Sequence, residues 1–217
     1  MTQIDPQEYQ KSLDKQTCRS TDLSDSYGKD SLVKEPLNVR ETTTSGMLDL
    51  NDLGNGLPAI TKYFGMVLAE AGGICLESQG HVQGVQLCVR GYSNGSYPLA
   101  WPPITEQIRR CWNDHEVATE HGAMGIAVLL AQKEIGYTVI KRSRKGTGFD
   151  YWMGDVSAYP FQNKARLEIS GIRGGNDQQV KARVQQKLKQ TGRSDGALPA
   201  YVIVVEFGQP LAEVQEK

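Results

Sequence analysis

The sequence predicts one domain of mixed α/β class over residues 56–217, with its core at 115–217. Segments with a helical period alternate there with short strand-like runs. One run, YVIVVEF at 201–207, is almost wholly apolar, which suits a strand covered on both faces. These observations together favour a sheet with helices packed on both sides.

The first 55 residues differ in composition from the rest. They are rich in Ser, Thr, Asp, Lys and Gln and poor in apolar side chains, so they bury too little surface to offset the entropy of ordering. We expect residues 1–55 to form a flexible polar arm, or a segment that folds on a partner.

A helix and hairpin lobe is predicted at 57–112. Apolar residues recur at steps of three and four from Leu57 to Ile74, as in an amphipathic helix. The runs at 84–91 and 97–101 are strand-like and flank YSNGS, whose Asn and Gly are typical of a hairpin turn. A short helix is expected at 104–112, after two prolines.

The core is predicted as helix, strand, strand, strand, helix, strand. Asn113 and Asp114 offer caps for a helix that runs to about Ile135. The expected strands are 137–143, 149–154, 165–171 and 201–207, and a helix follows Asp177.

Net charge and the lack of long apolar segments exclude some classes of protein. Lysine and arginine number 24 against 25 acidic residues, for a net charge of -1, which excludes a globally basic nucleic-acid-binding protein. The start lacks a leader-like apolar stretch and no long apolar run follows, so we expect a cytoplasmic protein that is not membrane-bound. The four cysteines lack metal-ligand spacing and are expected to be free thiols.

Two acids fall on the polar faces of neighbouring predicted strands. Strand alternation separates Asp150 and Trp152 from Tyr151, and separates Glu168 from the apolar residues beside it. If the two strands pair with these faces aligned, the carboxylates of Asp150 and Glu168 converge. Mg²⁺ or Mn²⁺ would allow both to stay ionised, so both residues are candidate metal ligands. The alternative is a pair of strand acids that bind arginines such as Arg166 on a solvated sheet face.

Glu120 is a third candidate acid. On the helix predicted from 115 it shares a face with Met124 and Ala127, which are suited to packing on the sheet. It is expected either to reach the metal or a ligand, or to lie in solvent or cap the helix near its start.

A basic turn lies directly before Asp150. Lys141, Arg142, Arg144 and Lys145 form a local positive patch in a neutral chain, which favours contacts with phosphate groups. The alternative is an ordinary solvated turn, and the glycines here match no phosphate-loop motif.

Two other patterns are weaker. The histidines of HEVATEH are six residues apart and do not share a helical face, which excludes a zinc-protease helix. Trp101, Trp112 and Trp152 are either base-stacking residues or, more commonly, core residues.

The order of elements over 115–217, the G-x-D of Gly148 to Asp150 and the later Glu168 resemble the PD-(D/E)XK nuclease superfamily. The resemblance implies a restriction-endonuclease-like αβββαβ core, here with an added N-terminal helix and β-hairpin. It places catalytic positions at Asp150, Glu168, Glu120 and Ser170. The family has a lysine where this chain has Ser170, and a hydroxyl cannot supply that charge.

The resemblance implies a Mg²⁺- or Mn²⁺-dependent endonuclease that hydrolyses DNA, in a setting such as host defence or restriction. Lys141, Lys145 or Lys164 could replace the missing lysine from a neighbouring segment. The competing hypothesis is a catalytically inactive nuclease-fold subunit of a larger complex that docks through residues 1–55. A third is DNA binding without cleavage, and assembly into a homo-oligomer is left open.

Overall fold

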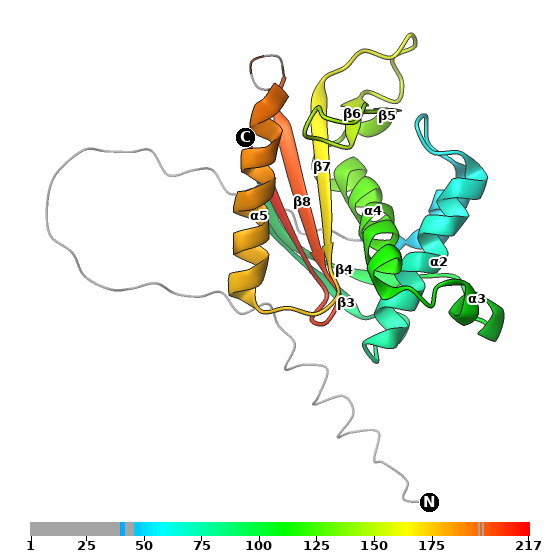
Figure 1. The fold of residues 1–217 in the computed structure, drawn as a ribbon. Coiled ribbons are helices and arrows are strands. Elements are labelled where there is room, and N and C mark those ends of the chain that lie inside the picture. Colours follow the sequence, from blue (N-terminus) through cyan, green and yellow to red (C-terminus); the bar gives the residue numbers. More distant parts are fainter. Residues whose placement is uncertain (1–39, 42–45, 195, 197) are drawn as a thin grey trace, which may run out of the picture. The chain divides into compact units, whose positions relative to one another are not determined.

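A curled mixed sheet with helices on both faces forms the described part of the computed structural model, which comprises residues 40–41, 46–194, 196 and 198–217 (Figure 1). The predicted mixed α/β class is therefore confirmed. The helices are the 3₁₀ helix η1 (Leu50–Asn55), α2 (Lys62–Ser78), α3 (Glu106–Cys111), α4 (His115–Glu134), α5 (Asp177–Thr191) and the 3₁₀ turn η2 (Gly192–Ser194). The strands are β1 (Arg40–Glu41), β2 (Leu48–Asp49), β3 (Gln86–Gly91), β4 (Ser93–Ala100), β5 (Thr138–Arg142), β6 (Tyr151–Gly154), β7 (Ala165–Ile172), β8 (Ala200–Glu206) and β9 (Leu211–Glu216).

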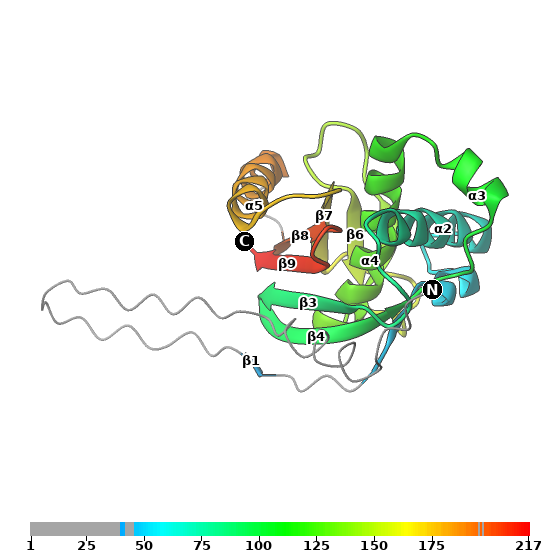
Figure 2. The same cartoon turned by 90° about the horizontal axis from the view of Figure 1, so that it is seen from below.

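Among the described residues the strand order is β1-β4-β3-β9-β8-β7-β6-β5, and β2 pairs with β4. Strands β5, β6 and β7 are consecutive and antiparallel, and β8 lies parallel to β7 after the crossover through α5. Strand β9 then runs antiparallel to β8 and parallel to β3, so it joins the hairpin β3–β4 to the rest of the sheet. Figure 2 shows this hairpin lying below α4 and α2.

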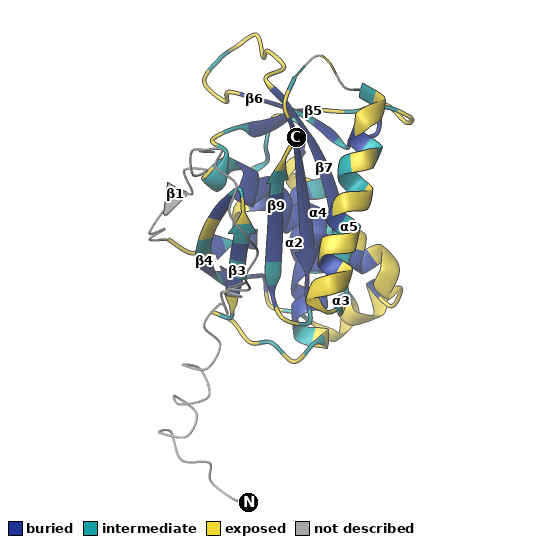
Figure 3. Cartoon of the chain, turned by 90° about the vertical axis from the view of Figure 1, so that its left-hand side faces the viewer, coloured by how far each residue is buried: buried dark blue, intermediate teal, exposed yellow. Residues whose placement is uncertain are grey.

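Helix α5 covers one face of the sheet and α4 covers the other, and α2 packs against α4 (Figures 1 and 2). Strand β8 contributes to both layers, because Ile203 belongs to the main core with α2 and α4 whereas Val202 packs against Val180 and Val184 of α5. This is the two-sided burial expected of an apolar run. Figure 3 shows the outer surface of α5 exposed and the strands beneath it buried.

Local sequence signals set the ends of the two core helices. Asp114 caps α4 by accepting hydrogen bonds from the backbone N–H groups of Glu116 and Val117. Helix α5 begins with a capping box between Asn176 and Gln179. These helices and strands β5 to β8 agree with the predicted order of elements.

Three details differ from the sequence-based expectations. Residues 46–55, assigned to the polar arm, belong to the fold, because Leu48, Leu50 and Leu53 are fully buried in the main core. Strand β9 was not predicted. The predicted turn at 92–96 lies mostly inside β4. Residues 1–39 and 42–45, which include most of the proposed arm, lie outside the described residues.

The cysteines and the helices bear on two further expectations. Cys75 and Cys111 are free, as predicted, whereas Cys88 is disulfide-bonded and that prediction was wrong. Within the described ranges no helix combines the length and apolar character needed to cross a membrane.

Helix α4 lies very close to β7 at Gly171. A Cβ atom added there would meet the backbone oxygen of Thr119 at 2.5 Å and the Cβ of Ala123 at 3.0 Å. Backbone oxygens cannot move aside as a flexible side chain can, so Gly171 sets the spacing between this helix and the strand that carries Glu168.

We therefore expect Gly171→Ala to lower the free energy of unfolding by about 2 kcal/mol, because the helix must shift or the backbone must strain. Gly174→Ala is the matched control, since its nearest neighbours would lie at 3.8 Å and its φ is not positive. The control should change stability by less than about 0.5 kcal/mol. Urea denaturation measures both, and equal stability of the two variants would contradict the account.

Candidate functional site

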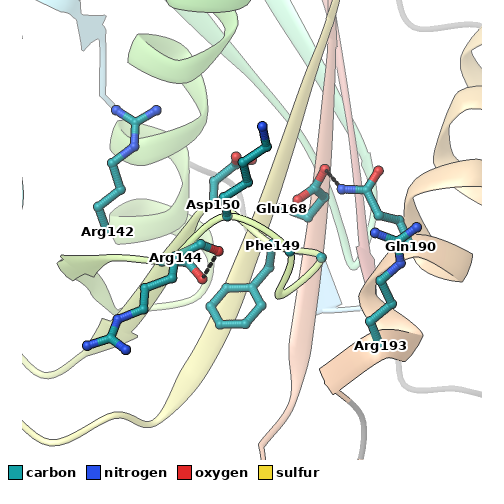
Figure 4. A pocket seen from close by; sticks show the side chains of 11 residues that line it. Arg142, Arg144, Phe149, Asp150, Glu168, Gln190 and Arg193 are labelled. Atoms are coloured by element: carbon teal, nitrogen blue, oxygen red, sulfur yellow. Dashed lines mark hydrogen bonds between the residues drawn. The ribbon is translucent and has the colours of Figure 1, made fainter.

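Asp150 and Glu168 come together at one cavity of about 320 Å³. Asp150 directly precedes β6, and Tyr151 pairs with Leu167 in β7, so Asp150 lies beside Glu168 on the neighbouring strand. One carboxylate oxygen of Asp150 accepts a hydrogen bond from the backbone N–H of Ile169 at 2.8 Å. Figure 4 shows both carboxylates between the turn that precedes β6 and the end of α5. The predicted convergence of these two acids is therefore observed.

Glu168 is buried and held by helix α5. Its side chain is 2% exposed, and one oxygen accepts hydrogen bonds from Nζ of Lys187 at 2.6 Å and from Nε2 of Gln190 at 2.9 Å. The alternative of a solvated strand acid bound to Arg166 is thus wrong for Glu168. The guanidinium of Arg166 donates instead to the backbone oxygens of Leu198 and Thr191.

The site disfavours ionisation of both carboxyl groups. Burial, and then the nearby charge of Asp150, raise the pKa of Glu168 to about 7, although Lys187 opposes the shift. The pKa of Asp150 is also raised, chiefly by burial. The hydrogen bond from the Ile169 N–H and the positive charge of Lys187 lower it, but by less. Both acids therefore keep their protons to a higher pH than exposed carboxyl groups do.

Lys187 was not identified as a candidate by the sequence analysis. Of the three lysines proposed to replace the family's lysine, only Lys145 lines the cavity, whereas Lys141 and Lys164 are exposed elsewhere. The signal in the sequence was helical spacing, because Lys187 lies three residues after the buried Val184 and so shares its sheet-facing side. A lysine on the apolar side of an amphipathic helix is unusual.

Ser170 does not line the cavity. It is buried, and its hydroxyl accepts a hydrogen bond from Nη1 of Arg183 at 2.8 Å. The same guanidinium donates more weakly to the backbone oxygen of Gly171 at 3.4 Å. The hydroxyl is therefore used to hold α5 on β7.

The basic turn forms one wall of the cavity. Arg142, Arg144 and Lys145 line it, together with Arg193 at the end of α5. Their side chains are exposed, so they can contact a ligand without first leaving a buried position. Lys141, the fourth predicted member, is not part of this wall.

The basic turn closes onto α5 at Gly148. This residue has a φ of 85°, which favours glycine, and a Cβ atom there would meet the backbone oxygen of Gln190 at 2.3 Å. Ser143 and Thr147 are hydrogen-bonded to each other across the turn. The close approach at Gly148 brings the turn and the Glu168-binding residues of α5 to the same cavity.

Glu120 is exposed, so its predicted inward-facing position was wrong. The preceding residue, Thr119, lies against Gly171 of β7. This contact keeps the start of α4 close to the sheet. The charge of Glu120 contributes to the raised pKa of Asp150. Glu120 therefore influences the site electrostatically from its outer edge.

The donor set limits the kind of metal that could bind. No group of three or more His, Cys, Asp or Glu side chains in the described part of the chain is placed to hold a metal ion. Asp150 and Glu168 alone suit Mg²⁺, which is usually held by one or two carboxylates, with water and substrate phosphate as its other ligands.

The tryptophans fit the core interpretation rather than base stacking in two of three cases. Trp101 and Trp112 are buried in the main core. Trp152 is half-buried and packs edge-on against Phe149, a cavity-lining residue, at 4.7 Å between ring centroids.

The raised pKa of Glu168 predicts a pH-dependent stability. Between its ordinary value of 4.5 and about 7 the unfolded chain has Glu168 ionised while the folded chain keeps it protonated. The folded state then binds more protons, so the free energy of unfolding falls as pH rises through this window.

Relative to Glu168→Gln, which does not titrate, the unmodified chain should lose on the order of 3 kcal/mol across that window. Urea denaturation at a series of pH values without divalent cations measures the difference. Parallel pH profiles for the two proteins would show that Glu168 has an ordinary pKa.

Three comparisons place these findings against known proteins. No model of a protein family matches the chain, and no match was found among curated proteins or among solved structures.

Proposed function

We propose that this protein is a Mg²⁺- or Mn²⁺-dependent nuclease that hydrolyses DNA phosphodiester bonds. The observation that carries the proposal is the meeting of Asp150 and Glu168 at one cavity with a basic wall, with Lys187 bound to Glu168 from α5. Two acids and a lysine suit metal-assisted attack on a phosphodiester, and exposed arginines suit binding of the DNA backbone.

The arrangement of elements supports a restriction-endonuclease-like core as part of this proposal. Helix α4, strands β5, β6 and β7, helix α5 and strand β8 follow in the order that the PD-(D/E)XK resemblance implies. Strands β5 to β7 are antiparallel neighbours, and β8 joins β7 in parallel. A role in host defence or restriction is included in this proposal on the basis of the resemblance alone.

The charge balance favours a cation between the two acids. Their pKa values are raised chiefly by burial and, for Glu168, next by the charge of Asp150. A divalent ion bound by Asp150 and Glu168 would stabilise both ionised forms. The chemistry supplied by a divalent ion held there would be polarisation of the phosphodiester and easier deprotonation of the attacking water.

Lys187 supplies the positive charge that Ser170 lacks. Its ammonium lies 2.6 Å from Glu168, and its charge also lowers the pKa of Asp150. We assign it the role of orienting the attacking water and stabilising negative charge that develops on the phosphate. Gln190 keeps Glu168 in place by donating to the same carboxylate oxygen.

The wall of Arg142, Arg144, Lys145 and Arg193 is assigned to phosphate binding. Guanidinium groups form paired hydrogen bonds with phosphate oxygens, and the three arginines of this wall are exposed. These contacts position the backbone without reading sequence.

A catalytically inactive nuclease-fold subunit is the second candidate function. It is favoured by the contacts of Glu168, whose buried carboxylate is already bound by Lys187 and Gln190. An acid neutralised in this way needs no metal ion for stability. This candidate predicts that Mn²⁺ does not bind at Asp150 and Glu168, which calorimetry on the metal-free protein measures.

Cleavage of labelled DNA in Mg²⁺ or Mn²⁺ tests the enzymatic proposal. We expect Asp150→Asn and Lys187→Met each to lower the cleavage rate by about 100-fold or more, since each removes a charge that stabilises the transition state. Lys189→Met is the matched control, because Lys189 is an exposed lysine of the same helix, whereas Lys187 is the lysine bound to Glu168.

The control variant should cleave at the unmodified rate. Circular dichroism of every variant separates loss of the site from loss of the fold. Equal cleavage by the unmodified protein, Asp150→Asn and Lys187→Met would show that the activity does not arise from this cavity.

A further inference from the structure

The loop between β6 and β7, residues 155–164, exposes large apolar side chains. Tyr159 is 86% exposed, Val156 is 64% exposed and Phe161 is 37% exposed. The rings of Tyr159 and Phe161 pack edge to face, with centroids 5.5 Å apart. Figure 1 shows this loop extending beyond the end of the sheet.

The base of the loop is anchored to the sheet. The backbone N–H of Lys164 donates to the oxygen of Met153 at 2.8 Å. Gly154 permits the chain to return over it, because a Cβ atom there would meet the backbone oxygen of Gln162 at 2.4 Å. The exposed aromatic pair is therefore presented from a fixed attachment.

The same two strands carry the candidate active site. Glu168 lies three residues along β7 from Ala165, where the loop ends. At a rise of about 3.3 Å per residue, the point where the loop joins β7 is about 10 Å along the strand from Glu168. Phe161 and Tyr159 precede that point by four and six residues. The basic wall of the cavity would hold phosphates of the same strand.

We propose that Tyr159 and Phe161 stack on unpaired bases of single-stranded DNA whose backbone lies in the cavity. This inference deepens the proposed nuclease function and rests on it. Bases within a duplex already stack on each other, whereas unpaired bases can stack on aromatic side chains whatever their sequence. The loop therefore selects single-stranded segments or frayed ends.

Fluorescence anisotropy with labelled DNA tests the loop apart from catalysis. A single-stranded oligonucleotide and its duplex are titrated in EDTA with the full-length protein and with the double variant Tyr159→Ala/Phe161→Ala. The double variant should bind the single strand at least tenfold more weakly, and the duplex less than threefold more weakly. Tyr63→Ala is the control, because Tyr63 is 89% exposed but belongs to helix α2 and not to this loop.

The outcomes separate the two proposals. Single-strand binding that depends on the loop, in a protein that cleaves no DNA, supports the loop and overturns the nuclease. Unchanged single-strand binding by the double variant overturns the loop proposal, even if DNA is cleaved, and leaves the loop as a surface for a protein partner. The loop proposal is also overturned if the double variant loses as much affinity for the duplex as for the single strand. It is overturned too if the unmodified protein binds no DNA.

Discussion

The carboxylate of Glu168 is buried beneath helix α5, where an unpaired charge costs several kcal/mol. Lys187 neutralises part of this charge, and one helical turn earlier Arg183 binds the hydroxyl of Ser170. The match is geometric: four residues of helix rise about 6 Å, and two residues of strand rise about 6.6 Å. Two polar contacts thus align α5 along β7, and this alignment brings Gln190 to Gly148 and closes the cavity. Site and fold depend on the same pairing of charges.

Most of the fold could be predicted from periodicity and end signals. The helices α4 and α5 have clear caps, and strands β5 to β8 are runs of β-branched, aromatic and apolar residues. Strand β9 was missed because LAEVQE is half polar, and the burial of Glu213 depends on Arg90 of the neighbouring strand β3. Residues 46–55 were missed because the three buried leucines are divided between the two-residue strand β2 and the short 3₁₀ helix η1, so they have no detectable period. Both cases depend on partners distant in sequence.

The candidate site was predictable only in part. Alternation along two neighbouring strands placed Asp150 and Glu168 together, since a period of two leaves one choice of face. The helical period wrongly favoured an inward position for Glu120, and the solvent-facing alternative is the one observed. Glu120 lies near the start of α4, where a small rotation of the helix separates a buried position from an exposed one. Lys187 was hidden for a different reason. Its contact with Glu168 depends on how α5 crosses from β7 to β8, and the local sequence does not predict how close Lys187 comes to Glu168.

The central claim is that Asp150 and Glu168 together bind a divalent cation, with Lys187 beside it. A crystal grown with Mn²⁺ tests this most directly, because the anomalous scattering of manganese marks its position independently of any assay. The account predicts a peak between the two carboxylates, about 2.1 Å from an oxygen of each, as for a hard cation with oxygen ligands. An ordered site without such a peak, with Glu168 still bound only to Lys187 and Gln190, would contradict it.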